Sequence, residues 1–283
     1  MKRHASTLLL IVIFLIGLSL LLYPSFSDWW NSFHQSRAVA SYVGTVANLD
    51  NEKYQRMWDE AQAYNAELAE KSMNLQLTEE EAAAYDKLLD VSGTGIMGYV
   101  DIPKIKVTLP VYHGTDEAVL QVAVGHIAGT SLPVGGESSH CVISGHRGLP
   151  RARLFTDIDR LVVGDTFTLN VLDNVLTYEV DQIRIVLPEE VENLAIEEGK
   201  DYCTLVTCTP YGINSHRLLV RGHRIETKAS SIRVTADALQ VENTTVAVCL
   251  AVPMLLALAI IVLVSTGIRK RKRKQQDSRT DER

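Results

Sequence analysis

Three side chains in this sequence of 283 residues could together carry out nucleophilic acyl transfer. Cys208 ends an apolar run that begins at Tyr202, with His146 62 positions before it and Arg217 nine positions after it. A thiolate can attack a carbonyl carbon, an imidazole can move protons, and a guanidinium can hold developing negative charge. An enzyme is therefore the leading interpretation, although an isolated cysteine is more often a small buried hydrophobe.

Turn-forming residues surround both the thiol and the imidazole. Residues 209–212 (Thr-Pro-Tyr-Gly) follow Cys208, and Gly145 and Gly148 bracket His146 just after a short apolar run. Proline cannot extend a β-ladder, and glycine adopts backbone conformations that other residues avoid. We therefore expect the two reactive groups to lie at the ends of two strands, next to loops.

These segments resemble the sortases. The resemblance rests on Ser144–Gly148, on Thr204–Cys208 with its TLxTC pattern, and on Arg217 within Asn214–Gly222. It runs from about Gly98 to Ile225. Two further stretches, Gly98–Ile105 and Gly129–Gly136, together with the apolar ends of the chain, are similar to class C, the pilin-polymerising subgroup.

The resemblance implies an eight-stranded β-barrel and a transpeptidase. Cys208 would attack the Thr carbonyl of an LPXTG-like sorting signal and form a thioacyl enzyme. His146 would protonate the departing amine and then accept a proton from the incoming one. Arg217 would hold the substrate backbone and the oxyanion, which its fixed fork of donors suits. In class C the incoming amine is a pilin lysine, whereas a sortase that attaches proteins to peptidoglycan would use the same three residues.

Other assignments are open from the sequence. His216 and His223 flank Arg217 and its strand and are the alternatives to His146 as general base. A membrane-tethered binding module without covalent chemistry is a second class. A thiol-disulfide oxidoreductase is a third, but no Cys-x-x-Cys occurs. The histidines lack the spacing of a metal site, and we expect neither a metal nor a cofactor.

Cys141 and Cys203 each lie five positions before one of the reactive residues, His146 and Cys208. If the two strands are parallel neighbours with His146 level with Cys208, as the sortase barrel implies, the two cysteines are level too. Neighbouring strands lie ~4.8 Å apart, within reach of a disulfide. We expect close sulfurs, as buried free thiols or as a disulfide, and facing away from the side of Cys208 because five is odd.

Two apolar segments predict membrane contact. The first, Leu8–Tyr23, follows basic residues and could be a cleaved signal sequence, but we expect an anchor. The second, Val246–Ile268, has 23 residues and precedes a basic tail, 269–283. The positive-inside rule then places both termini in the cytoplasm and residues 24–245 outside, at the cell membrane. That outer part has 18 basic and 31 acidic side chains, a net charge of −13, which disfavours nucleic acid as a partner. Membrane lipid is an expected partner, because the basic tail would touch anionic lipid.

The remaining patterns divide the chain. We predict a membrane anchor at 1–23, a helical segment at 24–95, a β-barrel at 96–228, a linker at 229–245, a transmembrane helix at 246–268 and the cytoplasmic tail. Helical periodicity covers 50–76, a capping box at Thr78 starts a helix ending near Asp90, and another helix is expected at 116–124. Strands are expected at 96–102, 107–112, 141–144, 166–172, 176–186, 202–208 and 216–225.

One family feature is missing from the sequence. Class C sortases commonly carry an Asp-Pro-aromatic lid over the active site, but no proline occurs between Pro24 and Pro103. Either other residues of the helical segment, such as Trp58 or Met73, cover the cleft, or the site is open. We expect an open site.

Overall fold

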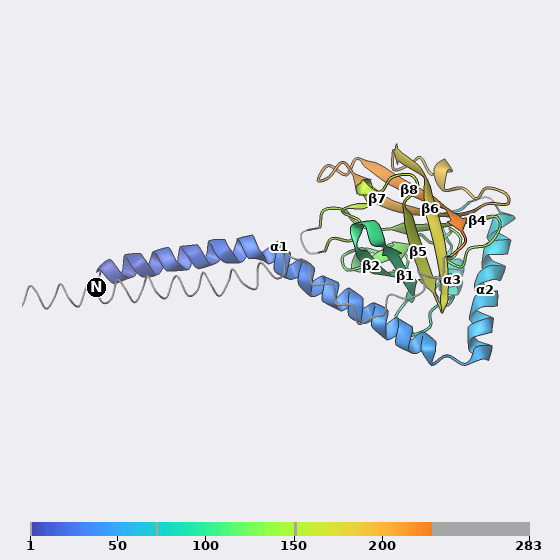
Figure 1. Cartoon of the computed structure of the whole chain (residues 1–283), viewed down its shortest axis with the longest axis horizontal. Coiled ribbons are helices and arrows are strands. Elements are labelled where there is room, and N and C mark those ends of the chain that lie inside the picture. Colours follow the sequence, from blue (N-terminus) through green and yellow to red (C-terminus); the bar gives the residue numbers. More distant parts are fainter. Residues whose placement is uncertain (1, 72, 150–151, 228–283) are drawn as a thin grey trace, which may run out of the picture. The chain divides into compact units, whose positions relative to one another are not determined.

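The structure, a computed structural model that describes residues 2–71, 73–149 and 152–227, contains a closed barrel of eight strands (Figure 1). The order around the barrel is β1-β2-β3-β4-β7-β8-β6-β5. Parallel pairing joins β2 to β3 and β4 to β7, and the other neighbours are antiparallel. The strands are β1 (Ile96–Ile102), β2 (Val107–His113), β3 (Val124–His126), β4 (Ser139–Ser144), β5 (Thr166–Val171), β6 (Asn174–Val186), β7 (Asp201–Thr209) and β8 (His216–Ile225).

Alternating side chains fill the barrel interior. Val100, Ile143, Leu205 and Val220 are fully buried in one apolar cluster, and each is flanked along its strand by residues of the opposite face. This buried cluster holds the strand ends in fixed register. The expected mainly β fold with an eight-stranded barrel is thereby confirmed.

The helices differ in extent from the expected ranges. They are α1 (Lys2–Ala47), α2 (Asn51–Ala69), α3 (Glu79–Tyr85) and α4 (Glu117–Leu120), with single 3₁₀ turns η1 (Pro103–Ile105), η2 (Ile158–Arg160) and η3 (Glu192–Leu194). The capping box is present, because Thr78 Oγ1 accepts from Glu81 N and Glu81 accepts from Thr78 N. The helix ends before Asp90 because turns follow Tyr85 and Leu89 has a positive φ of 59°. The expected helix at 116–124 is shorter, because Val124 begins β3, which the sequence did not predict.

The end of α1 is attached to the barrel by the buried hydroxyl of Tyr42. Its Oη donates a hydrogen bond to the Met97 carbonyl oxygen (2.9 Å) and accepts one from Leu172 N (2.7 Å). Around it, side chains of α1, α2 and α3 form an apolar cluster against the outside of β1. The helical segment is thus part of the folded unit.

We expect Tyr42→Phe to lower the free energy of unfolding by about 1–3 kcal/mol, because it leaves a buried N–H and a buried C=O without their partner. Urea unfolding of the detergent-solubilised chain measures this change. The matched control is Tyr99→Phe, since the Tyr99 ring packs edge-on against Tyr42 at 6.5 Å and is only partly buried. Equal effects of the two substitutions would contradict the attachment.

α1 contains a stretch, Ile11–Ala47, that is long and apolar enough to cross a membrane. The second expected span, Val246–Ile268, the linker before it and the basic tail lie outside the described residues.

Candidate active site

Cys208 and Arg217 face each other across two adjacent strands. Cys208 is the penultimate residue of β7, Arg217 is the second residue of β8, and their Cα atoms are register partners. Directly opposed residues of an antiparallel pair project from the same face of the sheet. The nucleophile and the guanidinium therefore share one side of the β7–β8 hairpin.

His146 continues the line of β4 toward the same place. β4 ends at Ser144, which is level with Val206, so His146 and Cys208 each lie two residues further on. Gly145 N donates to the Val206 carbonyl oxygen (3.0 Å), and Thr207 Oγ1 donates to the Gly145 carbonyl oxygen (2.7 Å), so the alignment continues past the end of β4. Because neighbouring strands lie ~4.8 Å apart, positions 146 and 208 are adjacent.

The surroundings of the three groups leave them accessible. His146 is 29% exposed, and its Nε2 lies 3.8 Å from Glu117 Oε2, a neighbour that the sequence did not reveal. Arg217 Nη1 donates to the carbonyl oxygens of Asn214 (3.2 Å) and His216 (3.1 Å). These two bonds hold the guanidinium at the start of β8 through Nη1, which leaves Nη2 and Nε without a partner among residues 2–71, 73–149 and 152–227.

The alternative general bases lie elsewhere. His216 is opposite Thr209, so it projects from the other face of the hairpin than Cys208. His223 is opposite Tyr202, six residues and roughly 20 Å along β8 from Arg217. Among the candidates weighed from the sequence, only His146 lies beside the thiol.

Three further histidines are tied into the fold by both ring nitrogens. They contact main-chain or side-chain oxygens at 2.6–3.0 Å, as follows: His113 with Gly95 and Leu88, His126 with Tyr85 and Ser131, and His140 with Ala195 and Thr204. Burial lowers the pKa of His140, which keeps that ring neutral. No group of three His, Cys, Asp or Glu residues in the described part of the chain could hold a metal ion.

The two other cysteines of the barrel are level, as expected. Cys141 on β4 and Cys203 on β7 are register partners, and both are buried free thiols. Burial raises the pKa of Cys203 well above its ordinary value, so this sulfur stays protonated. Both belong to the interior cluster, on the opposite face from Cys208, which argues against a redox pair with the nucleophile.

Alkylation distinguishes the three thiols. We expect iodoacetamide to modify Cys208 in the native chain and to leave Cys141 and Cys203 unmodified, because of these three cysteines, all in the described part of the chain, Cys208 alone is partly exposed. Peptide mapping by mass spectrometry measures the labelling, and the urea-unfolded chain, in which all three react, is the control. Native labelling of Cys203 would contradict the described packing.

An apolar strip of buried side chains lies on the face that carries Cys208. It consists of Val142 from β4, Val186 from β6, Val206 from β7, Leu219 from β8 and Leu194 from η3. Val206 and Leu219 are register partners, and they lie two residues along their strands from Cys208 and Arg217, on the same face. The strip therefore leads along the sheet to the sulfur.

The side chain of Met73, in the segment after α2, packs against this strip. Gly129 makes the close approach of that segment possible: a Cβ there would lie 2.1 Å from the Asn74 carbonyl oxygen. Asn65 of α2 adds two hydrogen bonds to the main chain of Leu132, at 2.7 and 3.0 Å. Cys208 itself is partly exposed, so an open site at the sulfur stays a prediction, whereas the strip is covered. Of the two alternatives, Met73 covers it, whereas Trp58 packs in the cluster against β1.

We expect Met73→Ala to raise kcat/KM for a sorting-signal peptide about fivefold. A partly buried methionine contributes about 1 kcal/mol of apolar contact that a substrate must displace. Steady-state kinetics measure the change, and Leu75→Ala, a partly buried residue of the same segment, is the control. A decrease in kcat/KM would show that Met73 helps to bind the substrate instead of covering its site.

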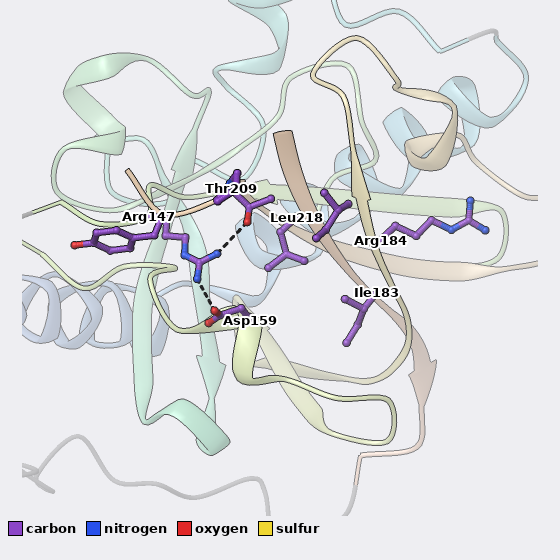
Figure 2. A pocket seen from close by; sticks show the side chains of 9 residues that line it. Arg147, Asp159, Ile183, Arg184, Thr209 and Leu218 are labelled. Carbon is purple, nitrogen blue, oxygen red and sulfur yellow. Dashed lines mark hydrogen bonds and ion pairs between the residues drawn. The ribbon is translucent and has the colours of Figure 1, made fainter. Parts of the chain in front are cut away.

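A separate hollow of about 630 Å³ lies behind the hairpin that carries Cys208 and Arg217 (Figure 2). Thr209 and Leu218, the sequence neighbours of these two residues, line it together with Arg147. Arg147 Nη1 donates to Thr209 Oγ1 (3.2 Å), and Arg147 also forms an ion pair with Asp159, as Figure 2 shows.

A sortase domain model matches residues 100–225. Sortase C1 from Streptococcus agalactiae is 49% identical with a TM-score of 0.67, covering 68% of this chain and 100% of that one. Sortase C from Clostridium perfringens, solved with the C-terminal cell wall sorting motif, is 41% identical with a TM-score of 0.60, covering 68% and 99%. Sortase A from Bacillus anthracis is 25% identical over 228 residues, covering 81% and 98%.

Proposed function

This chain belongs to the sortase family and is a cysteine transpeptidase, and we propose that it polymerises pilins through a thioacyl intermediate on Cys208. The observation that carries the proposal is the meeting of three strand ends: the thiol opposite Arg217 and next to position 146, at the end of an apolar strip. The roles of the three residues belong to the proposal.

In the first step the Cys208 thiolate attacks the Thr carbonyl of the sorting signal. Arg217 stabilises the oxyanion with charge-assisted hydrogen bonds. His146 gives a proton to the departing Gly amine, and the acyl group stays on sulfur. In the second step an amine attacks the thioacyl carbon, His146 accepts its proton, and the sulfur leaves.

We infer that the substrate is an LPXTG-like signal whose apolar Leu-Pro part lies along the strip of Val142, Val206 and Leu219. The C. perfringens relative was solved with a cell wall sorting motif, which supports this class of substrate. A pilin lysine as acceptor is supported by identities of 41–49% to class C structures. Attachment of proteins to peptidoglycan is the alternative, because it needs the same three residues.

We further propose an anchored enzyme whose barrel lies outside the cell and whose two termini are cytoplasmic. The apolar stretch of α1 supports the anchor. Exposed aromatic residues lie within this stretch, at Phe26, Trp29, Trp30 and Phe33, and such residues favour the membrane–water interface. Lipid is then a partner of α1.

One experiment tests the proposal. The detergent-solubilised chain is incubated with an LPXTG peptide and a candidate pilin, and its products are analysed by mass spectrometry. A thioester on Cys208 and a lysine-linked peptide are expected. A product on a peptidoglycan amine alone would favour the alternative acceptor, and binding without any adduct would leave only a non-catalytic module.

A further inference from the structure

The hollow behind the β7–β8 hairpin is close to the reacting sulfur but outside the apolar strip. Its lining residues Thr209 and Leu218 adjoin Cys208 and Arg217 in sequence. Successive side chains of a strand project to opposite faces. A ligand in the hollow would therefore reach the sulfur around the strand ends, while the strip stays occupied.

β6 borders the hollow with Ile183, Arg184 and Ile185, and the two isoleucines form an exposed apolar part of this wall. Ile183 is 39% exposed and Ile185 is 64% exposed. β5 pairs with β6 only up to Glu179, so beyond that point β6 pairs with β8 alone. Contiguous apolar patches that stay exposed on a protein surface often mark binding sites.

A polar anchor accompanies this apolar wall. The Nε of Arg147 is buried and has no hydrogen-bond partner among the described residues, although the same guanidinium bonds to Thr209 and Asp159. Nε itself is closed to a ligand, but Arg147 lines the hollow, and its guanidinium has further N–H donors that a peptide carbonyl can accept from.

The opposite wall is held in place by the ring of Tyr211. Gly148 has a φ of +76°, and a Cβ there would lie 2.8 Å from the Tyr211 ring. The loop after β7 thus packs on the loop after His146, and both border the hollow. The site is built between the two loops that follow the nucleophile and the proposed acid.

We propose that this hollow binds the acyl acceptor: an extended peptide segment that presents its lysine to the thioacyl carbon, places an apolar side chain on Ile183 and Ile185, and accepts a hydrogen bond from the Arg147 guanidinium with a main-chain carbonyl. The inference rests on the proposed function. A transpeptidase must admit the second substrate while the acyl part of the first still lies along the strip, so the acceptor enters from the other side. The amine nitrogen bonds to the carbonyl carbon, the C–S bond breaks, the sulfur leaves as thiolate, and His146 takes the amine proton.

The test measures how the thioacyl enzyme divides between aminolysis and hydrolysis. The full chain in detergent receives an LPXTG peptide and one of three acceptors: acetyl-Val-Lys-Val-amide, acetyl-Ser-Lys-Ser-amide or glycine amide. We expect the valine-flanked peptide to be preferred over the serine-flanked one about tenfold. Ile185→Asp should lower the aminolysis-to-hydrolysis ratio at least tenfold for the valine-flanked peptide, abolish its preference, and change the ratio for glycine amide less than twofold.

The matched control is Val163→Asp, an exposed β-branched residue (65%) that does not line the hollow. It should leave all three ratios as in the wild type. An unchanged ratio in Ile185→Asp overturns the inference. An equal loss with glycine amide also overturns it, because the hollow would then act on the reaction of every amine. An equal loss of thioacyl formation overturns it as well, because the hollow would then bind the acyl donor.

A second variant and the wild type complete the test. Arg147→Gln should raise the KM of the valine-flanked peptide at least fivefold, and an unchanged KM speaks against the carbonyl anchor. If the wild type forms no thioacyl enzyme, the proposed function fails and the inference fails with it. If the thioacyl enzyme forms but only water or glycine amide resolves it, the inference alone is overturned.

Discussion

Cys208→Ala should form no thioacyl adduct and should lose at least about a thousandfold in turnover of an LPXTG peptide. Removing a nucleophile leaves only binding and transition-state electrostatics, so losses of this size are usual. Mass spectrometry measures the adduct, and release of the Gly-terminated fragment measures turnover. The apolar strip is untouched, so the peptide should still bind.

The matched control is Cys203→Ala, on the same strand but on the interior face. It makes the same chemical change, the loss of one thiol, but in the core, and the folded fraction should still become acylated. An adduct that persists in Cys208→Ala, or one that is lost in Cys203→Ala at an unchanged melting temperature, would overturn the assignment of the nucleophile.

Arg217→Lys should lower kcat about 10²–10³-fold while the protein stays folded. Loss of one oxyanion donor in a preorganised site has effects of this size. Lysine keeps the charge but offers a point donor in place of the planar fork, and it cannot copy the bonds of Nη1 to Asn214 and His216 that orient the group. Single-turnover acylation with excess enzyme measures the chemical step directly.

Arg221→Lys is the control for this substitution. Arg221 lies on the same face of β8, four residues further along, and pairs with Asp181 (2.9 Å) and Glu197 (3.1 Å). Its replacement should change acylation less than threefold. If both arginines prove equally sensitive, general charge in the groove explains the effect, and the specific role of Arg217 is wrong.

Seven of the eight strands could be predicted from sequence because each combines an apolar run with turn residues at its ends. β3 could not be predicted, because three residues are too few to show the alternation of a strand, and because its position depends on parallel pairing with β2. The expected helix over 116–124 absorbed its first residue. Local sequence does not encode such a non-local contact.

In the candidate site, too, local motifs could be predicted from the sequence and contacts between distant segments could not. The identities of Cys208, His146 and Arg217 came from local motifs, and the sheet register then separated His146 from the rival histidines, since His216 faces away from the thiol. The contact of Met73 with the strip and the proximity of Glu117 to His146 join distant segments of the chain. Such contacts depend on the tertiary fold and leave no local pattern in the sequence.

The parallel pairing of β4 with β7 also has a consequence for biosynthesis. Cys208 and Arg217 meet within a local hairpin, whereas His146 reaches them only after a chain segment of about sixty residues has closed. Contacts of such high sequence separation form late and slowly. A partly folded chain in which only the β7–β8 hairpin has formed would therefore hold Cys208 opposite Arg217 while position 146 is still distant.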